Sequence, residues 1–146
     1  MPSFSHAVVV REPPDAVFPW LLEADRVPRW TSDLDVYEVL DGGSVREGAR
    51  IREQLEISGH RFAIELHVTR YDPPRSAESR FSTNGIDVVS VYTLEPEGDG
   101  TRLTQSVEAK PRSFGARMLL PVVWPRLQRK LPADLERLRE LLDGAP

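Results

Sequence analysis

The stretch that decides the fold is Gly115–Leu142, which reads GARMLLPVVWPRLQRKLPADLERLRELL. Its large apolar residues recur every three or four positions, and this spacing predicts one apolar face of an α-helix. The stripe consists of Leu120, Trp124, Leu127, Leu131, Leu135, Leu138 and Leu142. At roughly 1.5 Å per residue, the helix would be about 42 Å long. Three internal prolines remove amide donors and are expected to bend it, and its apolar stripe requires a partner surface.

Upstream of this helix, apolar residues alternate with polar ones, which predicts β-strands that bury one face. Ile64 and Leu66, for example, alternate with Glu65 and His67. The predicted strands are Val36–Leu40, Arg50–Ile57, Arg61–Tyr71, Ser76–Ser82, Ile86–Glu95 and Thr101–Ala109. Short, turn-like separators favour antiparallel pairing of consecutive strands. The long helix is the element available to cover their common face.

The N-terminal segment is expected to add one strand and two short helices. Phe4–Val10 is apolar and β-branched and stops before two prolines, which predicts a strand. Pro14 to about Ala24 shows helical spacing and is predicted to be a short helix that Pro19 limits or bends. Asp25–Trp30 follows as a second short helical or turn element. The complete order predicts an α+β fold, in which a curved, seven-stranded antiparallel sheet wraps around the long C-terminal helix.

Length and composition limit the class of protein. A chain of 146 residues with 40% hydrophobic and 29% charged residues is typical of one globular domain, here residues 1–146. The net charge of −4 disfavours nucleic acid and anionic membrane surfaces as partners. The absence of cysteine excludes disulfides and thiol nucleophiles. Because the start lacks a secretory signal and no apolar run could span a bilayer, we expect a soluble, cytoplasmic protein. We expect a monomer or a homodimer, and the sequence does not choose between them.

Three segments, together with the order of the elements, carry a resemblance to a known superfamily. They are VVVREPPDAVFPWLLEADRVPRW at residues 8–30, GTRLT at 100–104 and LERLRELLD at 135–143. The chain resembles the START-like, pollen-allergen-type helix-grip superfamily (SRPBCC), in its polyketide cyclase/dehydrase and lipid transport branch. The resemblance implies a ligand cavity between the concave sheet face and the long helix, opening near the short helices and loop tips. It does not choose between a binder, a carrier and an enzyme, because one scaffold hosts all three.

Candidate cavity residues are large aromatic side chains, and polar side chains in phase with apolar neighbours. They are Trp30, Glu53, Phe81, Ser90, Tyr92, Gln105 and Trp124. Each aromatic residue could instead fill the core. A buried polar side chain needs a hydrogen-bonding partner, water or a ligand, and Gln105 lies in mid-strand, so it is the preferred anchor. Glu53 lies near a strand start, where exposure to solvent is the expected outcome.

Other kinds of site have less support. His6, His60 and His67 lack metal-ligand spacing, so we predict no metal, and no cofactor motif or nucleophile elbow is present. A basic cluster surrounds the start of the long helix and comprises Arg112, Arg117, Arg126, Arg129 and Lys130. Such a cluster could meet an acidic ligand head group, but it more often forms a solvated helix face.

Three functional hypotheses remain. In the first, the protein binds a small hydrophobic or amphipathic molecule, such as a lipid, polyketide or aromatic metabolite, as a carrier or sequestering protein. In the alternative, the same cavity serves a polyketide cyclase/aromatase or dehydratase-like enzyme, and Glu53 could act as general acid or base. In the third, the cavity is collapsed and the chain is an interaction module. An enclosed cavity would separate the first two hypotheses from the third.

Overall fold

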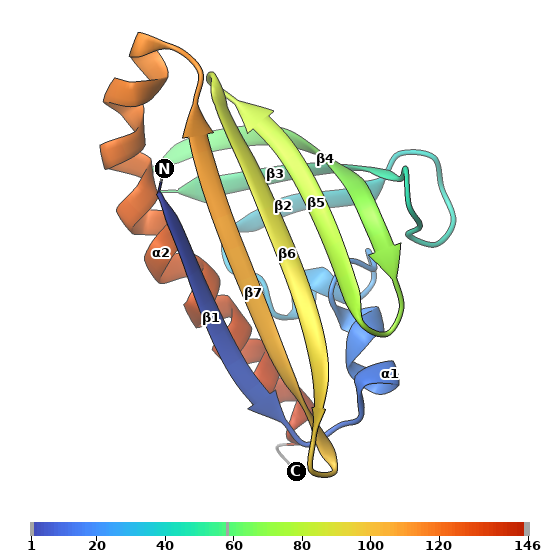
Figure 1. Ribbon diagram of the computed structural model, residues 1–146. Helices are drawn as coiled ribbons and strands as arrows, with labels where there is room; N and C mark the ends of the chain where they lie inside the picture. Colours follow the sequence, from blue (N-terminus) through green and yellow to red (C-terminus); the bar gives the residue numbers. More distant parts are fainter. Residues whose placement is uncertain (1, 58, 145–146) are drawn as a thin grey trace.

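One antiparallel sheet and one long helix dominate the computed structural model, which describes residues 2–57 and 59–144 (Figure 1). Within these ranges the sheet has seven strands in the order β1-β7-β6-β5-β4-β3-β2. The strands are β1 (Ser3–Val10), β2 (Leu34–Val39), β3 (Arg50–Ile57), β4 (His60–Asp72), β5 (Ser76–Thr83), β6 (Ile86–Glu97) and β7 (Gly100–Pro111). The helices are α1 (Pro14–Val17), the 3₁₀ turns η1 (Phe18–Trp20) and η2 (Val27–Arg29), and α2 (Phe114–Leu142).

This architecture confirms the predicted fold class. The curved sheet holds α2 along one side, and the short helices lie near one end of the sheet (Figure 1). The first predicted helix is shorter than expected: α1 ends at Val17 and passes directly into the 3₁₀ turn that contains Pro19. Proline cannot donate the amide hydrogen bond that an α-helix requires at this position, so the tighter turn takes over.

The first and last strands in the sequence pair at one edge of the sheet. β1 pairs with β7, while the segment between residues 11 and 33 carries the chain to β2 at the opposite edge. Gly100 permits this pairing, because a Cβ atom there would lie 2.1 Å from the carbonyl oxygen of Val10. Only glycine allows two backbones to approach so closely.

The long helix begins with a side-chain cap. Ser113 precedes α2, and its Oγ accepts a hydrogen bond of 3.1 Å from the amide of Ala116. The capping group satisfies one of the amide donors that every helix leaves unpaired at its N-terminus. α2 then continues as one helix through Pro121, Pro125 and Pro132. No helix in the two described ranges has the length and apolar character needed to cross a bilayer.

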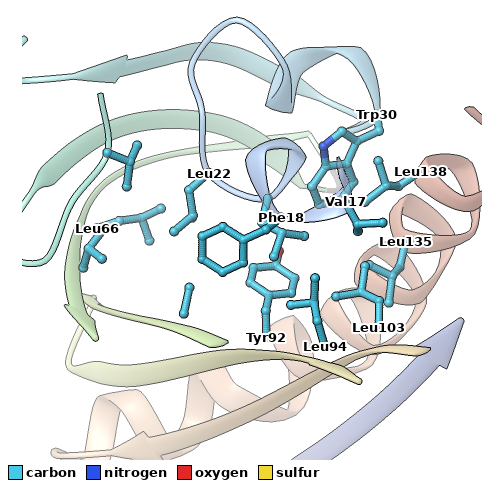
Figure 2. Packing of buried hydrophobic residues seen from close by; sticks show 14 of the residues in the cluster. Val17, Phe18, Leu22, Trp30, Leu66, Tyr92, Leu94, Leu103, Leu135 and Leu138 are labelled. Atoms are coloured by element: carbon cyan, nitrogen blue, oxygen red, sulfur yellow. The ribbon is translucent and has the colours of Figure 1, made fainter. Parts of the chain in front are cut away.

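The apolar interior consists of two clusters that share one side chain. The larger cluster joins the short helices, the sheet and the C-terminal half of α2, and includes Phe18, Tyr92 and Leu135 (Figure 2). The smaller cluster joins the sheet to the N-terminal half of α2 and includes Val107 and Trp124. Phe81 is partly buried and packs against both. The Phe81 ring therefore connects the two clusters into one continuous apolar interior.

Candidate ligand-binding site

A cavity of about 110 Å³ lies against the concave face of the sheet and is lined by the short-helix segment, strands β2 to β7 and α2. Six of the seven predicted site residues line it. They are Trp30, Glu53, Phe81, Ser90, Tyr92 and Gln105. Five of them lie on strands, where the alternation of side chains turns every second residue toward the helix, and Trp30 directly follows η2. Contact of these residues with a ligand stays a prediction.

Gln105 organises a polar group at one wall of the cavity. It faces Tyr92 across the β6–β7 ladder, and its side chain is 4% exposed. Its Nε2 donates hydrogen bonds of 3.2 Å to Ser90 Oγ and 3.3 Å to Tyr92 Oη. These bonds orient the amide, and all three residues line the cavity. The inward position predicted for Gln105 is confirmed.

Glu53 lies inside the cavity, so the expected exposure of this side chain is wrong. It is 8% exposed, because it lies on the concave face of the sheet, which the short-helix segment and α2 cover. Its neighbour Arg52 has the same two flanking strands but lies on the other face and is exposed. Within the described ranges, the Glu53 carboxyl makes no hydrogen bond and no ion pair shorter than 4 Å. It is a buried acidic group that faces open space in the cavity.

Burial controls the protonation of the acidic groups in this site. It raises the pKa of Glu53 from 4.5 to about 7, while the positive charge of Lys130 acts in the opposite direction. Burial and the charge of Glu53 also raise the pKa of both Tyr37 and Tyr92. The two phenols therefore keep their protons near neutral pH, whereas Glu53 can exchange its proton.

The Lys130 side chain is largely buried, which corrects its expected place on a solvated basic face. Its Nζ lies 2.6 Å from Asp134 Oδ2 and donates a hydrogen bond of 2.8 Å to the carbonyl oxygen of Ser32. Asp134 is 1% exposed and also accepts hydrogen bonds from the Ser32 amide and hydroxyl. These hydrogen bonds attach α2 to the loop that precedes β2. Lys130 and Asp134 both line the cavity.

Sequence reasoning missed Asp134, although a signal was present. An aspartate four residues after a lysine resembles an ordinary exposed pair on a helix. Asp134, however, lies three residues after Leu131 and four before Leu138, so it belongs to the apolar stripe. A charged residue in that phase must be buried with a partner.

Trp124 does not line this cavity, contrary to its prediction. Its ring packs edge-on against Phe4 of β1, with ring centroids 5.4 Å apart, in the smaller core cluster. The phase predicted for the helix is correct, because Trp124 is buried. The cavity instead meets the next part of α2, at Leu127, Lys130 and Leu131. A helix that crosses the sheet presents one stripe to different strands along its length.

The remaining basic cluster and the histidines lie away from the cavity. Arg112 pairs with Asp87 at 3.0 Å, and Arg117 and Arg129 are exposed. His6 Nε2 lies 2.8 Å from Glu136 Oε2 and ties β1 to α2. Among the described residues, no cluster of three or more His, Cys, Asp or Glu side chains is arranged to hold a metal ion.

Comparison with known proteins places the chain in a family. Residues 1–143 match the family model for polyketide cyclase/dehydrase and lipid transport. No curated protein matches the chain in sequence. Among solved structures, the chain is similar to Ara h 8.0201, with 14% identity, 97% of each chain covered and a TM-score of 0.76.

Two bacterial structures show the same likeness. A protein from Chromobacterium violaceum is 19% identical over 99% of each chain, with a TM-score of 0.74. A protein from Thermus thermophilus is 16% identical over 97% of each chain, with a TM-score of 0.75. At these identities the likeness shows the fold, and the family match covers nearly the whole sequence. The chain therefore belongs to the polyketide cyclase/dehydrase and lipid transport family and has the START-like helix-grip fold.

Proposed function

We propose that this protein binds a small amphipathic molecule in the cavity, as a carrier or sequestering protein. The observation that supports this most is the Glu53 carboxyl, which is buried in a mostly apolar cavity without a hydrogen-bonding partner among the described residues. Its oxygens border the open space of the cavity, since among the described residues no side-chain oxygen or nitrogen that is fully enclosed lacks a hydrogen-bonding partner. A ligand hydroxyl would supply the missing hydrogen bond, and the apolar walls would bind the rest of the ligand.

The size of the cavity limits what it can hold. Its volume of about 110 Å³ is below the roughly 300–1,000 Å³ of typical ligand pockets. It has room for a single ring or a polar head group, such as one end of a lipid, polyketide or aromatic metabolite. The family match and the likeness to Ara h 8.0201 are consistent with a protein that uses its interior for a small molecule.

The charges around the cavity favour an uncharged head group. Lys130 is already held by Asp134 and Ser32, so it is not free to pair with an anion. A ligand carboxylate would lie near Glu53 without compensation, and the two negative charges would repel. A hydroxyl group can donate to Glu53 and accept from a neighbouring hydroxyl, which matches this site.

Native mass spectrometry of freshly purified protein, followed by solvent extraction, tests the proposal directly. We expect a defined compound with an apolar part and a hydroxyl group. In parallel, titration calorimetry at about pH 8 should show that benzyl alcohol binds at least about tenfold more tightly than benzoate. Equal binding of benzoate would contradict the head-group assignment. Failure to bind either compound, together with a ligand-free mass, would contradict the proposed function.

One observation also favours the enzymatic alternative. A carboxyl group with a pKa of about 7 inside a cavity is suited to act as a general acid or base near neutral pH. A dehydratase would use the Glu53 carboxylate to remove the Cα proton of a 3-hydroxyacyl thioester and to return that proton to the departing hydroxyl group, so that the bond from C3 to oxygen breaks and water leaves. Incubation of the protein with such a thioester tests this alternative. If the protein is a dehydratase, the unmodified protein should form the enoyl product, and Glu53→Gln should form none while it still binds the substrate. No product from the unmodified protein would exclude this candidate for that substrate class.

The proposal also covers the location, the oligomeric state and the partners of the protein. We infer a cytoplasmic monomer or homodimer that needs no metal or organic cofactor and binds no nucleic acid. The net charge of −4 supports the last point, because it repels a phosphate backbone. Size-exclusion chromatography with light scattering tests the oligomeric state.

A further inference from the structure

We call the cavity of about 110 Å³ described above the head chamber. A second cavity of about 40 Å³, which we call the annex, lies next to it. The two share five lining residues, which are Leu55, Ile64, Phe81, Val88 and Leu127. All five are apolar. The head chamber and the annex are therefore separated by side chains alone.

Phe81 is the largest of these separating side chains. It packs against both core clusters and remains only partly buried, because it borders a hollow on each side. A phenyl ring makes no hydrogen bonds that would resist its movement. Its movement costs packing contacts but leaves no buried polar group without a partner. Phe81 can thus make room for a thin apolar chain.

The annex leads on to the surface of the molecule. It shares Phe62, Asn84, Leu119 and Val123 with a surface groove of about 270 Å³, which also includes His60 and Arg126. Its lining residues come from the start of β4, the turn between β5 and β6, and the N-terminal half of α2. These elements meet at the end of the molecule where α2 begins (Figure 1). Head chamber, annex and groove form a row that runs from the polar groups near Glu53 to solvent.

The side of the head chamber near the short helices is held by hydrogen bonds. Trp30 Nε1 donates to the carbonyl oxygen of Trp20 at 2.9 Å, and Tyr37 Oη donates to the carbonyl oxygen of Leu22. Lys130 holds Ser32 on the same side. An exit there would break several polar contacts, whereas the exit past Phe81 displaces only apolar groups.

From this geometry we propose that the ligand is a single-chain amphiphile with a hydroxyl head in the head chamber and a hydrocarbon tail that passes Phe81 into the annex and the surface groove. The proposal rests on the proposed function and specifies its ligand class. The narrow annex suits an unbranched chain and excludes fused rings. Its lining is apolar apart from Thr83 and Asn84, so a tail loses no hydrogen bonds when it enters.

Two alcohols and two tryptophan variants test this route. Benzyl alcohol fits the head chamber alone, whereas decan-1-ol needs the annex. Val123→Trp fills the shared wall of annex and groove. Met118→Trp is the matched control, because Met118 lies on the same helix, is 65% exposed and lines none of the three hollows. Binding is measured by titration calorimetry.

We expect Val123→Trp to weaken decan-1-ol binding at least about tenfold and to leave benzyl alcohol binding unchanged, while Met118→Trp changes neither. Equal loss for both alcohols, or no loss for either, would overturn the tail route and leave the proposed function intact. If the unmodified protein binds neither alcohol, the proposed function fails as well.

A second measurement keeps the test independent of variant folding. In amide NMR spectra of the unmodified protein, decan-1-ol should shift the signals of Asn84, Leu119 and Val123, and benzyl alcohol should not. Shifts confined to the short-helix segment with decan-1-ol would place the tail on the opposite side and contradict the proposal.

Discussion

At the scale of single residues, Glu53 makes the stability of the fold depend on pH. Its pKa is about 7 in the folded protein and 4.5 when freely solvated. At low pH both states carry the proton and burial has no electrostatic cost. As the pH rises from 4.5 toward 7, the unfolded chain releases the proton and the folded chain retains it, so the free energy of unfolding falls. At 1.36 kcal/mol per pH unit the total loss is about 3 kcal/mol.

Glu53→Gln should remove this dependence. Between pH 4.5 and about pH 8 the unmodified protein loses stability through Glu53 and the variant does not. Relative to the unmodified protein, the variant should therefore gain about 3 kcal/mol of unfolding free energy over this range. Urea unfolding at the two pH values measures it. Glu65→Gln, on the exposed face of β4, is the control and should show a much smaller shift. A constant difference for Glu53→Gln would mean that the carboxyl is solvated.

Gln105→Leu tests the polar wall of the head chamber. The substitution removes the amide that orients the hydroxyl groups of Ser90 and Tyr92. Loss of one oriented hydrogen bond is worth about 1–1.5 kcal/mol, so benzyl alcohol should bind about tenfold more weakly. Ser106→Val, the next residue along β7 with its side chain on the exposed face, should bind normally. Unchanged affinity in Gln105→Leu would remove Gln105 from the site.

At the scale of elements, α2 is joined to the loop before β2 by a buried ion pair. Lys130, Asp134 and Ser32 form a closed group in which the carboxylate accepts from an amine, an amide and a hydroxyl. A buried charge is tolerated only when its partners are present. The position of α2 over the cavity therefore depends on a polar contact as well as on the leucine stripe.

Asp134→Ala should destabilise the fold by about 3–5 kcal/mol, because it leaves Lys130 buried without a counter-charge. Arg137→Ala is the matched control: it also contacts Asp134, at 3.4 Å, but its side chain is half exposed, and its loss should cost less than about 1 kcal/mol. Chemical denaturation measures both. Similar losses of unfolding free energy in the two variants would show that the ion pair between Lys130 and Asp134 contributes no more to stability than the exposed contact of Arg137.

At the scale of the whole molecule, two core clusters share one sheet and one helix. Phe81 packs against both clusters, and α2 spans both. Every element of the smaller cluster also contributes to the larger one, so we infer that residues 1–146 fold as one cooperative domain.

Cooperative folding predicts that probes of the two clusters report one unfolding transition. Trp30 reports on the larger cluster and Trp124 on the smaller one. In urea, the fluorescence of Trp124→Phe and of the unmodified protein should give curves that coincide with the loss of far-ultraviolet circular dichroism after scaling. Separate midpoints for fluorescence and circular dichroism would indicate that the two ends of the molecule unfold independently.

Periodicity was sufficient to predict the elements and the face that each one buries. The direction in which a side chain leaves its own backbone is a local property. It follows from the alternation of residues in a strand and from the three- and four-residue spacing of the leucines in the helix. For this reason the sheet, the long helix and the inward direction of Gln105 and Tyr92 could be predicted from the sequence.

What lies opposite each face was decided by the tertiary structure alone. Glu53 is buried because the short-helix segment and α2 cover its face of the sheet, and Trp124 meets Phe4 because α2 crosses the sheet at that point. The Lys130 side chain is buried because the loop before β2 passes over it. Local spacing directs Glu53 toward the inner face, but the segments that cover it, like those that cover Trp124 and Lys130, are distant in sequence and meet only in the folded chain.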